Sequence, residues 1–226
     1  MIATVDQRVA GASTAEQTAT SRLARALDYA AWVHRDDQRR ATGAPYLSHL
    51  LGVCALVTEF GGDEEQQMVA LLHDTAEDHG GEKQLAEIEA EFGTAIAEMV
   101  RALSDSLTGE DIPKAAWEER KRAHVAALRS VPERTLLVAA CDKLDNVRSL
   151  TELIRRDGAK AFASFTAAIP SGVADSEEGV DLALGRDRSV WYYRTVAELV
   201  TERIAGPLGE RLTEAVDDLA GLAASV

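Results

Sequence analysis

The sequence has few cysteines, few prolines and few aromatic residues, and these shortages limit the fold it can adopt. Its 226 residues include 2 Cys, 5 Pro and 5% aromatic residues. Cys54 and Cys141 lie in apolar surroundings without a CxxC spacing, so we expect two reduced thiols in the core rather than a disulfide. Abundant Ala and Leu with little Pro favour helices over a sandwich or barrel. The composition therefore predicts an all-α fold.

Basic residues are also scarce: 24 Lys and Arg face 38 Asp and Glu, which gives a net charge of −14. This balance argues against general binding to nucleic acid or to anionic membranes. No apolar run approaches the ~20 residues that span a bilayer, and residues 1–20 lack the pattern of a signal peptide. We therefore expect a cytoplasmic protein without nucleic-acid or membrane partners. A phosphorylated small molecule stays possible, because a pocket can be locally basic and a metal ion adds positive charge.

The length suits one well-buried domain with terminal extensions. Residues 1–15 are small and polar and are expected to form a disordered leader. The domain itself is expected to span residues 16–205. Within it, residues 170–188 are rich in Gly, Ser and acidic side chains and are predicted to be a flexible insertion. Residues 206–226 are predicted to form a C-terminal helix that packs on or extends the domain.

One predicted helix carries an unusual group of polar residues at its C-terminal end. Asp63 is a good N-cap, with Gln66 three residues on, and Gly80 ends the helix. The last turns carry four polar side chains that are close together on the helix surface, namely His73, Asp74, Glu77 and Asp78. Carboxylates this close repel one another unless a cation lies among them, and imidazole beside carboxylate suits a divalent transition metal. The group is therefore predicted to be half of a metal site.

Two further residues are candidates for the other half. Asp142 lies in an otherwise apolar helical run, and burying an unpaired carboxylate costs several kcal/mol. His49 opens another helix that is too apolar for a surface position. Together with His73 and Asp74, these residues give two imidazoles and two carboxylates and leave room for water or phosphate oxygens. Asn146, one turn after Asp142, is expected to face the same site.

Three motifs in a fixed order resemble a known family. They are Pro45-Tyr46-Leu47-Ser48-His49, then Leu71-Leu72-His73-Asp74-Thr75-Ala76-Glu77-Asp78, then Asp142-Lys143-Leu144-Asp145-Asn146-Val147-Arg148. This series is similar to the HD-type hydrolases of alarmone metabolism, which are the hydrolase domain of Rel/SpoT proteins and the stand-alone small alarmone hydrolases. The similarity runs from about residue 22 to residue 200. It implies an HD-domain helical bundle.

The resemblance implies a role for each matching residue. The ligands of a single divalent ion, usually Mn²⁺, would be His49, His73, Asp74 and Asp142. Glu77 and Asp78 would orient and deprotonate the attacking water. The implied substrate contacts are Arg40 on the guanine base, Asn146 beside the ribose and phosphates, Ser149 in place of a family threonine, and Tyr192 in the nucleotide pocket.

The reaction that the resemblance implies is hydrolysis of the 3′-pyrophosphate of (p)ppGpp, which gives GDP or GTP and pyrophosphate. Because no region resembles the family's synthetase domain, we expect hydrolysis only. The partner would therefore be a guanine nucleotide alarmone as substrate.

Departures from the family pattern leave two alternatives open. Ala41 stands where the family commonly has lysine after the arginine, which removes one phosphate contact. A second hypothesis is therefore a phosphohydrolase acting on another nucleotide, such as the 2′-phosphate of NADPH or a nucleoside monophosphate. A third is a non-catalytic nucleotide sensor, against which intact Glu77 and Asp78 argue. Asp145 replaces a family histidine or aromatic residue and is expected to be solvated or to lie beside the metal ligands.

Several other polar residues are expected to have structural roles. His34 is predicted to be hydrogen-bonded within the packing, and His79 and His124 are predicted to lie on the surface. One interpretation of Arg39 and Arg40 is a solvated charge pair, although substrate contact is favoured for Arg40. Lys121 and Arg122 are interpreted as part of a solvated helix face.

Overall fold

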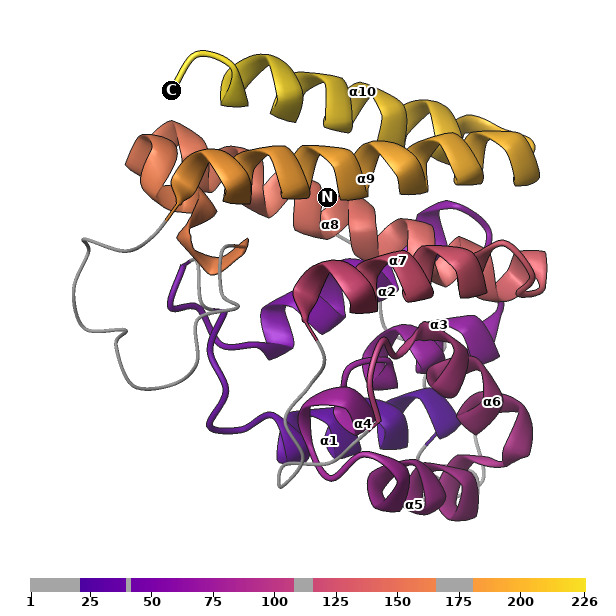
Figure 1. Ribbon diagram of the computed structural model, residues 1–226. Coiled ribbons are helices and arrows are strands. Elements are labelled where there is room, and N and C mark those ends of the chain that lie inside the picture. Colours follow the sequence, from indigo (N-terminus) through magenta and orange to yellow (C-terminus); the bar gives the residue numbers. More distant parts are fainter. Residues whose placement is uncertain (1–20, 40–41, 108–115, 166–180) are drawn as a thin grey trace, which may run out of the picture.

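The chain folds into a helical bundle (Figure 1). The computed structural model describes residues 21–39, 42–107, 116–165 and 181–226, and within these ranges no β-strand is present. The predicted all-α class is confirmed, whereas the predicted leader at 1–15 lies outside the described residues. The helices are α1 (Arg22–Val33), α2 (Leu47–Glu59), α3 (Glu64–Leu72), α4 (Thr75–Asp78), α5 (Glu82–Phe92), α6 (Thr94–Leu103), α7 (Trp117–Leu128), α8 (Glu133–Asp157), the 3₁₀ helix η1 (Gly158–Phe165), α9 (Leu182–Arg203) and α10 (Pro207–Ala223). Among these helices, none combines the length and the apolar character that crossing a membrane requires.

Helices α3 and α8 form the centre of the bundle. Helix α3 packs against α1, α2, α6 and α8, while α8 also contacts α2, α6, α9, α10 and η1. Their inward side chains, such as Met68 and Leu72 of α3 and Leu136 and Leu144 of α8, are fully buried. Each such side chain contributes roughly 1.5–3 kcal/mol of burial free energy. The packing therefore holds the end of α3 and the middle of α8 in fixed relation.

The ends of the central helices follow the sequence signals. The Asp63 side chain accepts a hydrogen bond from the Gln66 backbone, and the Gln66 side chain accepts one from the Asp63 backbone, so the capping box is complete. Pro132 precedes α8, and Gly158 ends it with a φ of 62°, a backbone conformation that favours glycine.

The helix predicted to run through Glu77 is instead broken after Leu72. Two side chains compete with the helical backbone ladder at this point. The His73 ring Nδ1 lies 2.8 Å from the Ala70 carbonyl, and the Thr75 hydroxyl donates to the Leu72 carbonyl at 2.6 Å. The chain then resumes as the short helix α4, which carries Glu77. His73 thus lies at the end of α3, while the acidic pair lies on a separate turn.

The C-terminal part of the chain forms a layer of long helices along one side of α8, at the top of Figure 1. The flexible insertion predicted over 170–188 is wrong at its C-terminal end, because α9 begins at Leu182. The Asp181 side chain caps this helix by accepting from the Leu184 backbone at 2.9 Å. Residues 170–180 of the predicted insertion lie outside the described residues. Helix α10 packs against both α8 and α9.

Candidate metal centre and active site

Two buried histidines are held so that their Nε2 atoms point to one place. His49, on α2, and His73, at the end of α3, are 2% and 3% exposed. The Nδ1 atom of His73 lies 2.8 Å from the Ala70 carbonyl, and that of His49 lies 2.7 Å from Asp145 Oδ2. An imidazole that donates from Nδ1 presents a lone pair at Nε2. This is the arrangement in which histidines usually bind a metal ion.

The carboxylates of Asp74 and Asp142 lie opposite these Nε2 atoms. His73 Nε2 is 3.1 Å from Asp74 Oδ2 and 3.7 Å from Asp142 Oδ1, and His49 Nε2 is 3.6 Å and 3.3 Å from the same two oxygens. Among the described residues, the buried His73 Nε2 atom has ion-pair contacts with these carboxylates but no hydrogen-bond partner. Atoms bonded to one ion at about 2.1 Å are separated by similar distances. The structure thus brings together the four predicted residues, and His49, His73 and Asp74 form a cluster able to bind a metal ion.

The electrostatics of this cluster favour a cation. Burial alone would lower the pKa of His49, but its bonds to Asp142, Asp145 and Asp74 raise the pKa to about 9. Burial alone would raise the pKa of Asp142, yet Lys143 and the two imidazoles hold it well below its usual range. The Lys143 ammonium donates directly to Asp142. The carboxylates therefore stay ionised, and positive charge between the imidazoles is stabilised, as a bound metal ion requires.

An outer set of contacts orients the candidate ligands. The Arg39 guanidinium donates to Asp145 Oδ2 at 2.8 Å and to Asn146 Oδ1 at 2.9 Å. Asn146 in turn donates to Asp142, so it faces the cluster as predicted. The interpretation of Arg39 as a solvated residue is wrong, because its side chain is only 13% exposed and both of its terminal nitrogens donate hydrogen bonds within the protein.

Gly52 makes room for this outer set. A Cβ atom at position 52 would lie 2.7 Å from Asp145 Oδ1, closer than unbonded atoms can approach. The glycine in the middle of α2 therefore allows Asp145 to reach His49. Asp145 was predicted to be either solvated or beside the metal ligands. It lies beside them, because its carboxylate bonds to His49 and to Arg39.

Tyr46 is a further member of the site. Its hydroxyl donates to Asp74 Oδ2 at 2.6 Å, and its ring stacks on His34 with centroids 4.9 Å apart. Burial and the negative charges of Asp74 and Asp78 raise the pKa of the phenol, so it remains a proton donor. The sequence motif contained Tyr46, but nothing in the motif indicated this contact.

Glu77 is positioned by a residue that the sequence did not indicate. The Asp105 backbone N–H donates to Glu77 Oε2 at 3.0 Å. The Asp105 carboxylate, only 2% exposed, accepts from Arg120 and from Lys121. Burial alone would raise the pKa of Asp105, but these two cations hold it well below its usual range. The prediction that Lys121 belongs to a solvated helix face is therefore wrong.

The predicted substrate contacts have different surroundings. Ser149 lines an open pocket of about 300 Å³ together with Arg39, His49 and Asp145. Because His49 lines it, this pocket adjoins the metal cluster, by which we mean the candidate ligands His49, His73, Asp74 and Asp142, on the side of α2 and α8. Arg40, the predicted contact to the base, lies outside the described residues.

Tyr192 is buried instead of facing this pocket. It is 3% exposed, and its hydroxyl has no hydrogen-bond partner among the described residues. The ammonium groups of Lys121 and Lys143 lie 5.1 Å and 5.9 Å from the centre of its ring. Tyr192 is thus connected to the metal cluster through Lys143, the neighbour of Asp142. His124, predicted on the surface, is also buried, and burial together with the same two lysines lowers its pKa to about 3.

Helices enclosing a pair of histidines and a pair of aspartates define a class of helical metal-binding domain. The sequence profile of the HD domain family matches residues 26–175, and the chain belongs to this family. It is 36% identical over 133 residues to the guanosine-3′,5′-bis(diphosphate) 3′-pyrophosphohydrolase MESH1 of Mus musculus, covering 58% of this chain and 70% of that protein.

Longer bacterial proteins also match the chain. The chain is 34% identical over 152 residues to the guanosine-3′,5′-bis(diphosphate) 3′-pyrophosphohydrolase of Aquifex aeolicus, covering 67% of this chain and 21% of that protein. It is 38% identical over 128 residues to the GTP pyrophosphokinase rsh of Brucella melitensis, covering 57% of this chain but only 17% of that protein. The chain thus spans less than a quarter of the length of these two relatives.

Solved structures share the fold. A metazoan relative of SpoT, described as hydrolysing ppGpp, superposes with a TM-score of 0.63 at 23% identity and covers 89% of this chain and 94% of its own. A protein of Listeria monocytogenes EGD-e superposes with a TM-score of 0.59 at 22% identity, covering 76% of this chain and 99% of its own. The predicted HD-domain helical bundle is confirmed.

Proposed function

We propose that this protein is a metal-dependent hydrolase that removes the 3′-pyrophosphate of (p)ppGpp and releases GDP or GTP and pyrophosphate. The observation that carries the proposal is the convergence of two buried Nε2 atoms on Asp74 and Asp142, with Glu77 held nearby by Asp105. The names of the Aquifex and mouse relatives support the choice of substrate. The two free cysteines and a nucleotide substrate are both compatible with a cytoplasmic location, which is part of the proposal.

The donor set fits a divalent ion of the Mn²⁺ type. His49 and His73 would offer nitrogen, and Asp74 and Asp142 would offer oxygen, a mixture that suits manganese, iron or zinc. We take Mn²⁺ as the native ion. When bound, such an ion lowers the pKa of water and offsets negative charge on the attacked phosphate.

The chain's own residues supply proton transfer and positioning. Glu77 or Asp78 accepts a proton from the attacking water, while the Asp105 backbone N–H keeps Glu77 oriented. A new P–O bond forms to this water and the bond between phosphorus and the ribose 3′ oxygen breaks. The 3′ oxygen then takes up a proton. Tyr46 holds Asp74 through its hydroxyl.

The nucleotide is proposed to lie along the face formed by α2 and α8. Ser149 on the open pocket and Asn146 beside Asp142 are suited to ribose and phosphate oxygens. Arg40 is proposed to stack on the guanine base. Tyr192 is proposed to act through Lys143, which its ring contacts.

The function is tested by measuring phosphate and pyrophosphate release from ppGpp, NADPH and nucleoside monophosphates, with Mn²⁺ added and with metal stripped. We expect pyrophosphate from ppGpp alone, and none after metal removal. Release of orthophosphate from NADPH or from a nucleoside monophosphate would show that the enzyme acts on that nucleotide instead of ppGpp. A protein that binds metal and guanine nucleotide but turns over no substrate would be a sensor, and the hydrolase proposal would be wrong.

Asp145 is expected to tune the affinity for metal. Replacing Asp145 with Ala removes the carboxylate that orients His49, and losing such a contact typically costs about 10- to 100-fold in metal affinity. Gly52→Ala should weaken binding in the same direction, because the added methyl group displaces the same carboxylate. Competition with a fluorescent chelator measures both affinities.

The matched control is Gly221→Ala in α10, where a Cβ atom meets nothing within 4 Å. This variant should keep the affinity of the unmodified protein. Equal affinity in the Asp145→Ala protein would show that His49 does not depend on this carboxylate.

A further inference from the structure

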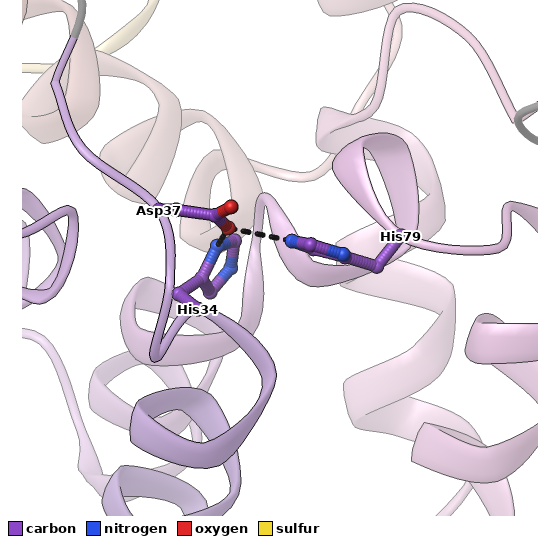
Figure 2. Close-up of side chains that lie close together, drawn as sticks. All are labelled: His34, Asp37 and His79. Atoms are coloured by element: carbon purple, nitrogen blue, oxygen red, sulfur yellow. Dashed lines mark hydrogen bonds and ion pairs between the residues drawn. The ribbon is translucent and has the colours of Figure 1, made fainter.

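A second cluster of metal-ligating groups lies at the edge of the site. His34 follows α1, Asp37 lies in the turn after it, and His79 follows α4 (Figure 2). Asp37 Oδ2 is 2.7 Å from His34 Nδ1 and 2.6 Å from His79 Nε2. The three residues each present one ligand atom within 4.8 Å of the others. His79 was predicted to be a surface residue, but it is bound to Asp37.

The donor set of this cluster is that of a transition-metal site. Two imidazoles and one carboxylate bind zinc, iron, cobalt or manganese and leave coordination positions for water. His34 is 2% exposed, while the side chains of Asp37 and His79 are 34% and 31% exposed. One ligand is thus fixed in the interior, and the other two are partly exposed to the solvent from which an ion would bind. The high net negative charge of the chain, −14, favours cation entry.

In the absence of a metal ion, Asp37 Oδ2 accepts hydrogen bonds from both His34 Nδ1 and His79 Nε2. Both imidazoles must carry a proton on the nitrogen that faces Asp37. A metal ion can take the place of these two protons if each imidazole moves its proton to its other nitrogen, so the rings stay neutral. Bonds of about 2.1 Å to each ligand require donor atoms roughly 3.3 Å apart. The Asp37 oxygen, now 2.7 Å and 2.6 Å from the two nitrogens, has to move away from each by less than about 1 Å, while the two nitrogens already lie within 4.8 Å of each other.

We propose that His34, Asp37 and His79 form a second divalent-metal site, distinct from the cluster of His49, His73 and Asp74, that takes Zn²⁺ or a similar ion. An ion at this site joins the end of α1 to the end of α4, the turn that carries Glu77 and Asp78. It also acts on the first cluster through stacked rings, because His34 stacks on Tyr46 and Tyr46 donates to Asp74. The ion therefore stabilises the turn of the acidic pair without touching substrate.

Metal stoichiometry tests this proposal without any substrate, so its outcome is independent of the proposed hydrolysis. The metal-stripped chain is dialysed against Zn²⁺ or Co²⁺ and its metal content is measured by mass spectrometry. We expect two ions per chain, falling to one in His79→Gln and in Asp37→Asn. The control Asp36→Asn removes a neighbouring carboxylate that is 85% exposed, and it should keep two ions.

A second background isolates the new site. His73→Asn disables the first cluster, and this protein should still bind one Co²⁺ with a visible absorption spectrum of its own. Saturating Zn²⁺ should raise its Tm by about 5–10 °C at a 100-fold excess over Kd. Adding His79→Gln should abolish both the spectrum and the shift in Tm.

One outcome overturns the proposal. The proposal is wrong if the unmodified chain binds at most one ion at saturation and His79→Gln leaves that number and its affinity unchanged. His34, Asp37 and His79 would then be joined by hydrogen bonds only. Circular dichroism of the metal-free variants verifies folding. Because Asp37 and His79 belong to different elements, a folding defect in one variant leaves the other as the test.

Discussion

Glu77→Gln should reduce kcat for pyrophosphate release by about 10²- to 10⁴-fold, the usual contribution of a positioned general base. The amide keeps an oxygen that can accept the hydrogen bond from the Asp105 backbone, but it has lost the ability to take up a proton. The metal content and Tm should stay those of the unmodified protein. Single-turnover assays with Mn²⁺ and metal analysis of the same sample measure the effect.

Two further variants make this result specific. Glu82→Gln changes an exposed glutamate that pairs with Arg101 on the surface, and it should leave kcat unchanged. Asp78→Asn changes the other acidic residue of the turn, and the larger loss of the two identifies the residue that receives the proton. A Glu77→Gln protein that retains more than about a tenth of the rate with full metal would exclude Glu77 as that base.

Asp105→Asn should lower the free energy of unfolding at neutral pH by about 3 kcal/mol, because it leaves two cations without their buried partner. The carboxylate is 2% exposed and accepts from both Arg120 and Lys121. Urea denaturation followed by circular dichroism measures the loss. The backbone N–H that positions Glu77 is kept in this variant, but the carboxylate that anchors this segment to Arg120 and Lys121 loses its charge, so we expect activity to fall as well.

The pH dependence follows from the lowered pKa of Asp105. A carboxyl group with a lowered pKa in the folded state adds stability above the unfolded pKa of about 3.9, and this contribution is lost as the pH falls below it. The difference between Asp105→Asn and the unmodified chain should therefore be full at pH 7 and shrink under acid. As a control, Asp157→Asn changes an aspartate that pairs with Arg156 at the surface and should alter stability little. A constant difference from pH 7 to pH 2 would contradict this account.

The grouping of His73, Asp74 and Asp142, which are candidate metal ligands, could be predicted from local features of the sequence. His73 and Asp74 lie at the end of a helix with a recognisable capping box, and Asp142 is a carboxylate in an apolar helix. An ionisable residue in such a run requires a partner, so the pattern alone indicates a polar site at this position. The sequence does not predict the break after Leu72, because the residues from His73 to Asp78 are compatible with a continuous helix. The side-chain bonds of His73 and Thr75 to backbone carbonyls end it.

The surrounding contacts could not be predicted, because they join residues far apart in the chain. Arg39 meets Asp145 across 106 positions, and Asp105 meets Glu77 across 28. In the sequence, Arg39 is one of two adjacent arginines and Asp105 belongs to a polar connection, and each pattern is common on solvated surfaces. Long-range packing, such as that of α8 against α2 and of α7 against α6, brings these residues together with their partners.

The close approach of Gly52 to Asp145 has an evolutionary consequence. A side chain at position 52 and a carboxylate at position 145 cannot occupy the same space, so the two positions cannot change independently. A lineage that replaced Asp145 with a smaller residue would release position 52 to accept alanine, which a helix interior prefers to glycine by about 1 kcal/mol. Once alanine was fixed there, a returning aspartate would be displaced from the position in which it reaches His49. The order of substitutions along α2 and α8 is thus constrained by one contact between them.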